Sequence, residues 1–497
     1  MRKKILLIIC FIFVIFVTGC INKVKIPVGV KPSKEFTVFS YINDDAIFQA
    51  SSELIITGLS EEGVVIVCSI YDKKGNLINE SYCTTSANGK WSLTIDTPSS
   101  SNDRYTLKIK DSNDIYHQTF NDIKFGEVWL YIGDELKNIN SEKEDEFQNQ
   151  DVVHDYNLMF FKDDIWLPAN ENISQFNYLL ANEIYDTNKL WNKHPVGIVF
   201  ATSEEDLIYK WLSYSAISSR KLIMQYLENE NLNYDEENSL YEKYLKIYKN
   251  MSYSNVIINQ GIADLKLFNN LNYDNNYFKN IYSLQLYTFI SELINDFNIS
   301  DNVFILQDSI NQDKNISSLR TIQSNITNYY NITSIIPTYD LNLFYDIDND
   351  LIHTDFNEIE GEFDIIGYNY DKLVSRIIKF NYNSYKATKL EHVVQEYNKF
   401  NIMTTVKLIF EDKLDYEDNQ LINGLTFIDN VGNEVELSYS INDNEIIIDL
   451  EIDSELDLEN KQYVDLKYIC YGQKIEIFDN NLFSSNVPVI PFEIRLK

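Results

Sequence analysis

The stretch Phe125-Gly126-Glu127-Val128-Trp129-Leu130-Tyr131 contains the first of several apolar runs that decide the fold class. Four runs have the length of a buried strand and follow one another at wide intervals: Val128–Tyr131, Val196–Phe200, Val256–Ile258 and Val303–Leu306. Longer stretches lie between them, and the one from Tyr277 to Phe297 has apolar residues at helical spacing. Because strands separated by helices favour a parallel sheet, we expect an α/β domain over residues 121–382.

The regions on either side of this domain contain short strands broken by turns. Between residues 35 and 120, Gly75-Asn76 and Ala87–Lys90 mark turns, while Trp91–Ile95 alternates apolar and polar residues like a half-buried strand. Similar runs return after residue 383, at Val406–Phe410 and Glu445–Leu450. The pattern predicts β-sandwich modules over residues 35–120 and 383–497 that flank the α/β domain.

The N-terminus has the organisation of a bacterial lipoprotein signal. Arg2–Lys4 form a basic segment, Ile5–Val17 is apolar but short for a membrane span, and Val17-Thr18-Gly19-Cys20 resembles a lipobox. We therefore predict a signal peptide over residues 1–19, lipid on Cys20, and a tether over residues 20–34. This places the protein in the bacterial cell envelope, on the extracytoplasmic side, with the membrane as a partner. The alternative is an uncleaved anchor helix with an incidental cysteine.

Charge and cysteine content narrow the partners further. The chain has 42 Lys and Arg against 75 Asp and Glu, a formal net charge of −33, which repels nucleic acid. Cys68 and Cys83 flank a predicted turn and either pair across it or serve as small buried hydrophobic residues. The Cys and His residues show no metal-ligand spacing, so we expect no metal and no cofactor.

Beyond the tether, a series of short motifs appears in a fixed order. Gly89–Leu93 is similar to "GxWSV", Gly126–Leu130 reads "GEVWL", His194–Ile198 is similar to "VPVGL", and Ser318–Gln323 is similar to "LREAQ". Their order and spacing resemble the sialate O-acetylesterase family of SGNH-type carbohydrate esterases. The resemblance implies an SGNH-hydrolase-like parallel sheet with helices, and a serine esterase site.

The first two blocks of that site are altered. In the family the nucleophile lies in "CSGQSNM", directly after "GEVWL", and here the serine position is Glu135, followed by Leu136. A carboxylate carries no proton for a histidine to remove. The second block has a Gly-Gly pair in the family, and its counterpart Thr202–Asp206 includes Glu204. Side chains and negative charge there oppose a developing oxyanion.

The third and fourth blocks are altered as well. Gln260 and Gly261 match the family's "YQGESN", but the glutamate after them is replaced by Ile262. The family's "DIH" reads Leu351-Ile352-His353, so the histidine persists while Leu351 replaces its acidic partner. The adjacent Asp350 is a weak substitute.

The acids of the altered blocks have two interpretations. If the fold is kept, they converge at the old cleft, where they either ligate calcium or are solvated loop acids, the second being favoured. They are Asp134, Glu135, Glu204, Glu205 and Asp206. We therefore predict a catalytically inactive protein that binds glycans or a surface protein. The alternatives are an active carbohydrate O-acetyl esterase with a rearranged site, and a structural lipoprotein without a small ligand.

Overall fold

The computed structural model describes most of the 497-residue chain. The described residues are 36–496 apart from 40, 113, 135, 137–156, 169–172, 188–193, 204–205, 233, 272–273, 308–315, 339–340, 342–361, 383–385, 416–421, 423, 453–461, 472–482, 485–486 and 491. The predicted signal peptide, Cys20 and the tether lie outside them. Of the helices described, none combines the length and apolar character needed to cross a membrane.

A parallel sheet forms the centre of the fold, in the strand order β9-β11-β8-β12-β13-β14, with β10 antiparallel to β9 at one edge. Its strands are β8 (His117–Gly133), β9 (Leu158–Lys162), β10 (Ile165–Pro168), β11 (Val196–Thr202), β12 (Ser252–Asn259), β13 (Asn298–Gln307) and β14 (Thr333–Pro337). The four apolar runs lie in β8, β11, β12 and β13, as predicted. Every residue of β12 is buried, because helices cover both faces of the sheet.

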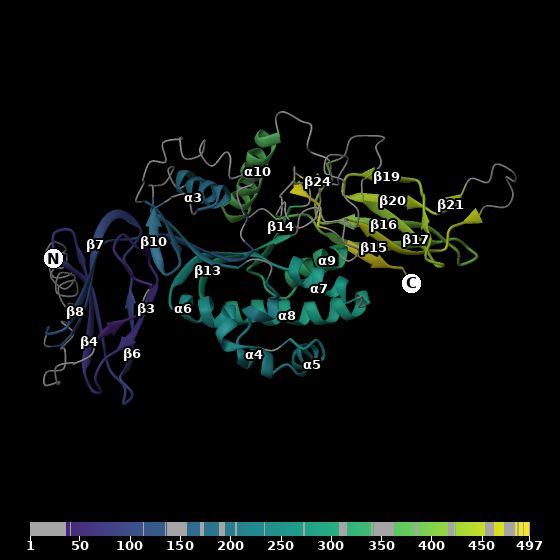
Figure 1. Ribbon diagram of the computed structural model, residues 1–497. Coiled ribbons are helices and arrows are strands. Elements are labelled where there is room, and N and C mark those ends of the chain that lie inside the picture. Colours follow the sequence, from purple (N-terminus) through teal and green to yellow (C-terminus); the bar gives the residue numbers. More distant parts are fainter. Residues whose placement is uncertain are drawn as a thin grey trace, which may run out of the picture.

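Helices α3 (Gln175–Thr187) and α10 (Glu362–Tyr382) lie on one face of this sheet, and α7 (Ile262–Asn270), α8 (Asn275–Asp296) and α9 (Ile316–Ile326) lie on the other (Figure 1). The helix predicted from Tyr277 to Phe297 is α8, which begins where the Asp274 carboxylate accepts the Tyr277 N–H at 2.9 Å. Shorter helical segments are α4 (Tyr214–Ser218), α5 (Lys221–Asn229), α6 (Lys246–Tyr248), Ile208–Trp211, Glu236–Asn238 and Tyr241–Leu245.

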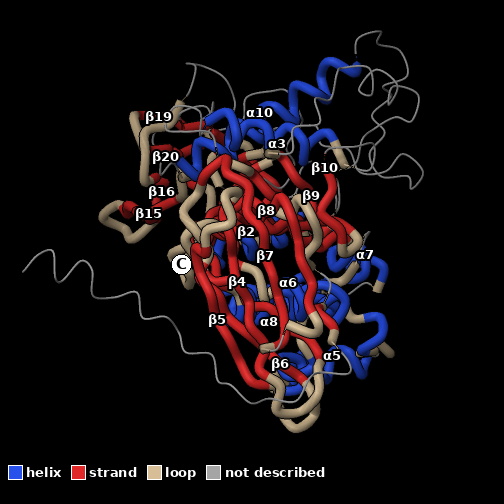
Figure 2. The backbone as a smooth tube through the Cα atoms, turned by 90° about the vertical axis from the view of Figure 1, so that its left-hand side faces the viewer, coloured by secondary structure: helices blue, strands red, loops and turns tan. Residues whose placement is uncertain are grey.

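Some of the amino-terminal strands form a sheet of their own and the others extend the central sheet, and all share one hydrophobic core with the α/β region. The strands are β1 (Thr37–Val38), β2 (Ile47–Gln49), β3 (Glu53–Leu59), β4 (Val65–Asp72), β5 (Leu77–Thr84), β6 (Lys90–Asp96) and β7 (Ser101–Asp111). β1, β3 and β6 make one sheet, while β5, β4 and β7 run side by side (Figure 2) and join β8. The buried and exposed residues of β6 alternate as predicted.

Strand β8 connects these two regions of the molecule. Its first half pairs with β7, and from Glu127 onward it pairs with β11 and then also with β12. The expected boundary between residues 120 and 121 therefore falls inside one continuous strand. The division of the chain into domains stays a prediction.

The carboxyl-terminal region has two four-stranded antiparallel sheets, β15-β16-β20-β19 and β18-β17-β23-β26, around a second hydrophobic core (Figure 1). Their strands are β15 (Leu390–Tyr397), β16 (Met403–Phe410), β17 (Leu425–Asp429), β18 (Glu434–Val435), β19 (Tyr439–Asn442), β20 (Glu445–Asp449), β23 (Leu466–Tyr471) and β26 (Phe492–Arg495). Two small strand pairs complete it, β21 (Glu451–Ile452) with β22 (Gln462–Tyr463) and β24 (Phe483–Ser484) with β25 (Val487–Pro488). An ion pair between Lys279 and Glu493, 2.8 Å apart, links α8 to β26.

The described cysteines are free thiols. The register between β4 and β5 places Cys68 opposite Ser81 and Cys83 opposite Ile66, so the two cysteines do not face each other directly. Cys68, Cys83 and Cys470 carry no disulfide in the structure.

Candidate functional site

The candidate site lies where β8, β11 and β12 end. Thr202 and Asn259 are the last residues of β11 and β12, and both lie beside Gly133, the last residue of β8. The chain continues from β8 to strands on one side and later returns to β12 on the other. In open α/β sheets, ligands bind beyond the carboxyl ends of the strands at such a reversal. We give the name carboxyl-edge crevice to the described residues around these strand ends, Gly133, Asp134, Ser203, Asp206, Gln260 and Gly261.

Gly133 sets the turn that enters the crevice. Its φ of +108° is unfavourable for side-chain-bearing residues, and a Cβ there would lie 2.0 Å from the Asn259 carbonyl oxygen. The Asp134 N–H donates to that same oxygen at 2.8 Å, and Asn259 Nδ2 donates to the Asp134 carbonyl at 2.7 Å. The turn is therefore fixed by the neighbouring strand. Glu135 lies outside the described residues, and Leu136 is buried.

The segment after β11 packs against this turn. The Ser203 N–H donates to the Gly133 carbonyl at 3.3 Å, and the Ser203 hydroxyl donates to the Asp206 carboxylate. Lys210 forms an ion pair with the other oxygen of Asp206. Asp206 is therefore a paired carboxylate and not a freely solvated one. Glu204 and Glu205 lie outside the described residues.

The segment after β12 is held deep in the protein. Gln260 is 2% exposed, and its amide nitrogen donates to the Asp206 carbonyl. Gly261 has a φ of +135°, and a Cβ there would lie 2.6 Å from the Tyr282 hydroxyl. Tyr282 and Gln323 also donate to the Gln260 carbonyl, at 3.2 and 3.1 Å. The two positions that match the family motif thus maintain close packing between β12, α8 and α9.

Asp264 is a buried acid that the motif comparison did not single out. It is 1% exposed, and its carboxylate accepts the Ile208 N–H at 3.0 Å. Burial raises the pKa of Asp264 from 3.8 to about 7, and the negative charge of Asp134 adds to the increase, while hydrogen bonds from Ile208 and Gln260 oppose it. The carboxyl group therefore changes charge near neutral pH.

The surroundings of Asp264 contain a signal that sequence reasoning can use. Its helix, α7, begins with the buried residues Ile262, Ala263 and Leu265, so the acid lies on an apolar turn. An acid on such a turn is a candidate for a shifted pKa.

The remaining predicted positions have no described geometry. His353, Leu351 and Asp350 all lie outside the described residues, as does Glu135. Within the described part of the chain, no group of three or more His, Cys, Asp or Glu residues is arranged to hold a metal ion. The structure thus brings together Asp134, Asp206, Gln260 and Gly261 around the end of β8.

The described donors around Gly133 are engaged within the protein. The amides of Asp134 and Ser203 donate to the carbonyl groups of Asn259 and Gly133. An oxyanion hole needs preorganised donors that point at the reacting oxygen. The amides of Asp134 and Ser203 are therefore occupied within the protein, beside the carboxylates of Asp134 and Asp206.

Comparison with known proteins gives a fold and no family. No family model matches the chain, and no curated protein matches it. The crystal structure of a carbohydrate acetylesterase from Xanthomonas citri is similar, with a TM-score of 0.66 and 15% sequence identity, covering 93% of this chain and 99% of that one. A β-glucuronidase from Bifidobacterium dentium has a TM-score of 0.23 and 11% identity, over 61% of this chain and 52% of that one, too low to inform the fold. The chain therefore has a carbohydrate esterase fold.

Proposed function

We propose that this protein is a non-catalytic, glycan-binding lipoprotein of the bacterial envelope. In this proposal it derives from sialate O-acetylesterase-like enzymes and keeps their SGNH-type arrangement between two β-sandwich modules. Lipid on Cys20 holds it to the membrane. The observation that carries the proposal is the sequence Gly133-Asp134-Glu135 at the end of β8, with an acid at the family's serine position, in a chain whose fold is that of a carbohydrate esterase.

Electrostatics supports the loss of hydrolysis. Asp134 follows the glycine turn directly, and Asp206 is connected to the same turn through Ser203. At an effective dielectric constant of about 20, two unit negative charges ~4 Å apart repel by roughly 4 kcal/mol. A penalty of that size on an oxyanion slows a reaction by about three powers of ten. Lys210 offsets part of this field, because it neutralises Asp206.

Binding is tested by titrating the purified protein with host and bacterial glycans. We expect saturable binding of at least one glycan. This binding is expected to weaken in a variant with asparagine at both Asp134 and Asp206, because carboxylates accept hydrogen bonds from sugar hydroxyl groups. Lys413→Ala, on the carboxyl-terminal region, serves as the control. Failure of every glycan in a broad panel to bind would refute the proposal.

An active esterase with a rearranged site is the second candidate. The hydrogen bond of the Ser203 hydroxyl is the observation that favours it. Its hydroxyl lies at the end of β11 and donates to the Asp206 carboxylate, as a nucleophile donates to its base. However, Lys210 is already bonded to that carboxylate, which makes it a poor proton acceptor. Loss of acetyl-ester turnover in the Ser203→Ala variant would make this candidate the better one.

The anchor is tested separately from the ligand. Metabolic labelling with a radioactive fatty acid is expected to mark the wild-type chain and not the Cys20→Ala variant. Labelling that persists in the variant would contradict lipidation at this residue.

A further inference from the structure

Two neighbouring pockets lie at the opposite edge of the parallel sheet, where β12 and β13 begin. The first has a volume of about 620 Å³ and the second of about 500 Å³, and they share Gln49, Ala50 and Ser51 as a common wall. The second is called the amino-edge pocket here, and the residues that carry the argument are Ser100, Glu127, His194, Asp301, Asn381 and Tyr382. Neither pocket belongs to the carboxyl-edge crevice.

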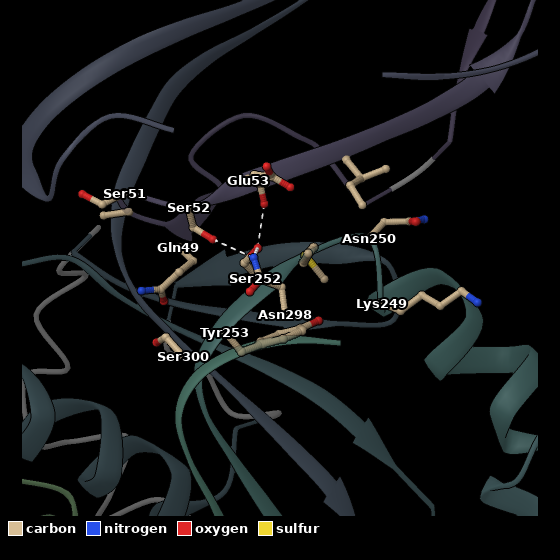
Figure 3. A pocket seen from close by; sticks show the side chains of 13 residues that line it. Gln49, Ser51, Ser52, Glu53, Lys249, Asn250, Ser252, Tyr253, Asn298 and Ser300 are labelled. Atoms are coloured by element: carbon tan, nitrogen blue, oxygen red, sulfur yellow. Dashed lines mark hydrogen bonds between the residues drawn. The ribbon is translucent and has the colours of Figure 1, made fainter. Parts of the chain in front are cut away.

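The first pocket has a structural explanation. Asn298 Nδ2 donates to the hydroxyl oxygens of Ser52 and Ser252, at 3.2 and 2.9 Å, and Ser252 Oγ donates to the Glu53 carbonyl at 2.6 Å (Figure 3). These side chains bond to one another and connect β3 with β12 and β13. Their hydrogen-bonding groups therefore stabilise the contact between two sheets.

The amino-edge pocket differs because it presents an aromatic ring that is held in place. Tyr382 is 37% exposed, and its hydroxyl donates to both carboxylate oxygens of Glu127, at 3.0 and 2.9 Å. Trp129 Nε1 donates to the same carboxylate at 2.7 Å. The ring is thus preorganised at the wall of an open pocket, where it offers an apolar face next to polar groups.

Polar groups with unused bonding capacity surround this ring. Ser100 Oγ and His194 Nδ1 are buried atoms without a hydrogen-bond partner among the described residues. Asn381 lies beside Tyr382 at the end of α10, and its Oδ1 accepts from Asn302 Nδ2 at 3.1 Å. The two unpartnered atoms are shielded from solvent, whereas Glu127 and Asn381 are partly exposed and Asp301 is exposed, so a ligand can reach these three residues.

The lining also indicates the class of ligand. Among the described residues that line the amino-edge pocket there is no lysine or arginine, whereas Glu127 and Asp301 are acids. An anionic ligand is therefore disfavoured, and the formal net charge of −33 disfavours it further. Carboxylates and amides that accept hydrogen bonds, beside an aromatic face, suit a ligand rich in hydroxyl groups. The volume lies within the range of small-molecule sites.

We propose that the amino-edge pocket binds an uncharged saccharide, with its ring face on Tyr382 and its hydroxyl groups on Glu127, Asn381 and Asp301. This site is separate from the one in the proposed function and does not depend on it. Glu127 and Gly133 are six residues apart on β8, so about 20 Å of strand separates these two residues.

The test uses two uncharged disaccharides, cellobiose and N,N′-diacetylchitobiose, with sialyllactose as the charged comparison. Binding to the purified full chain is followed by saturation-transfer NMR and by tryptophan fluorescence, to which Trp129 contributes. We expect saturable binding of at least one uncharged disaccharide at concentrations up to about 10 mM. The Tyr382→Ala variant is expected to bind roughly fivefold more weakly, because it lacks the aromatic face.

Four further variants make the result interpretable. Tyr382→Phe keeps the ring and is expected to lose less affinity than Tyr382→Ala. Tyr397→Ala, which removes another exposed tyrosine outside the pocket, is expected to leave this binding unchanged. Asp206→Asn, in the carboxyl-edge crevice, reports whether the disaccharide binds there instead. If circular dichroism shows that Tyr382→Ala is unfolded, Asn381→Ala takes its place.

The possible failures are distinct. Binding that weakens only in Asp206→Asn would overturn the amino-edge site and leave the proposed function standing. Disaccharide binding that is unchanged in both Tyr382→Ala and Asn381→Ala would also overturn the amino-edge site. The absence of saturable binding by either uncharged disaccharide, or a preference for sialyllactose, would also overturn it.

Discussion

Replacing Asp264 by asparagine is expected to make the protein more stable, by an amount that grows as the pH rises. The folded state holds the pKa of Asp264 at about 7, above its ordinary value of 3.8, because the carboxyl group is buried. An acid with a raised pKa binds its proton more tightly in the folded state than in the unfolded state. The contribution of Asp264 to the free energy of unfolding is therefore greatest at low pH. It is lost as the pH rises from about 4 to about 7.

The size of the effect follows from the change in pKa. A rise from 3.8 to about 7 corresponds to roughly 4 kcal/mol of unfolding free energy lost above neutral pH. At about pH 5 the loss is roughly 2 kcal/mol, because the unfolded state has released its proton and the folded state has not. Asparagine has no such proton. Its oxygen can keep the Ile208 N–H bond.

Urea unfolding between about pH 5 and pH 8 measures this difference. We expect the stability gained by Asp264→Asn to increase by about 2–3 kcal/mol across that range. Asp429→Asn is the control, because hydrogen bonds from Asn433 hold the pKa of Asp429 below its ordinary value, so its titration is complete before pH 5. Parallel pH profiles for wild type and Asp264→Asn would refute the assignment of a buried, neutral-range acid.

Three further predictions concern single positions. Gly133→Ala is expected to lower the free energy of unfolding by about 3 kcal/mol or more, because its Cβ would lie 2.0 Å from the Asn259 carbonyl oxygen. Gly63→Ala, which also has positive φ but open space around it, is expected to lose about 1 kcal/mol, and equal losses in urea unfolding would contradict the steric argument. Burial raises the pKa of the Cys68 thiol, so a disulfide reagent at pH 8 is expected to label Cys68 only after unfolding. If Cys68 is not labelled in protein that is unfolded without a reductant, it forms a disulfide. Lys279→Ala is expected to lower the free energy of unfolding by at most about 1 kcal/mol in thermal unfolding, because its ion pair with Glu493 is partly exposed. A larger loss would show that this contact holds the carboxyl-terminal region in place.

Sequence patterns predicted the elements that have one dominant periodicity. The run Val256–Ile258 and the helical spacing after Tyr277 correspond to β12 and α8, because burial on both faces or on one stripe leaves a regular imprint. The hairpin of β9 and β10 was not predicted. Its signal is the pair Asp163-Asp164, both with positive φ, between two short apolar runs.

The carboxyl-edge crevice and the amino-edge pocket depend on contacts between distant parts of the chain, whereas a single helix or strand depends mainly on its local sequence. Asp264 is buried partly by distant parts of the chain, including the segment at Ile208, 56 residues away, so the apolar turn around it indicates a raised pKa without giving its size. The amino-edge pocket combines Glu127 with Tyr382, 255 residues apart, through the hydrogen bonds from the Tyr382 hydroxyl to the Glu127 carboxylate. By contrast, Gly261 was placed by a local motif, because tight turns after strands require particular residues at particular positions.

Hydrolysis is the measurement that tests the central claim most directly. The purified full chain would be incubated with 4-nitrophenyl acetate, O-acetylated sialic acid and acetylated xylan, and acetate release would be followed over time. We predict a rate equal to that of buffer alone, unchanged in Ser203→Ala and His353→Ala. Saturable acetate release by the wild type that disappears in either variant would contradict the claim that this esterase fold has lost its catalysis.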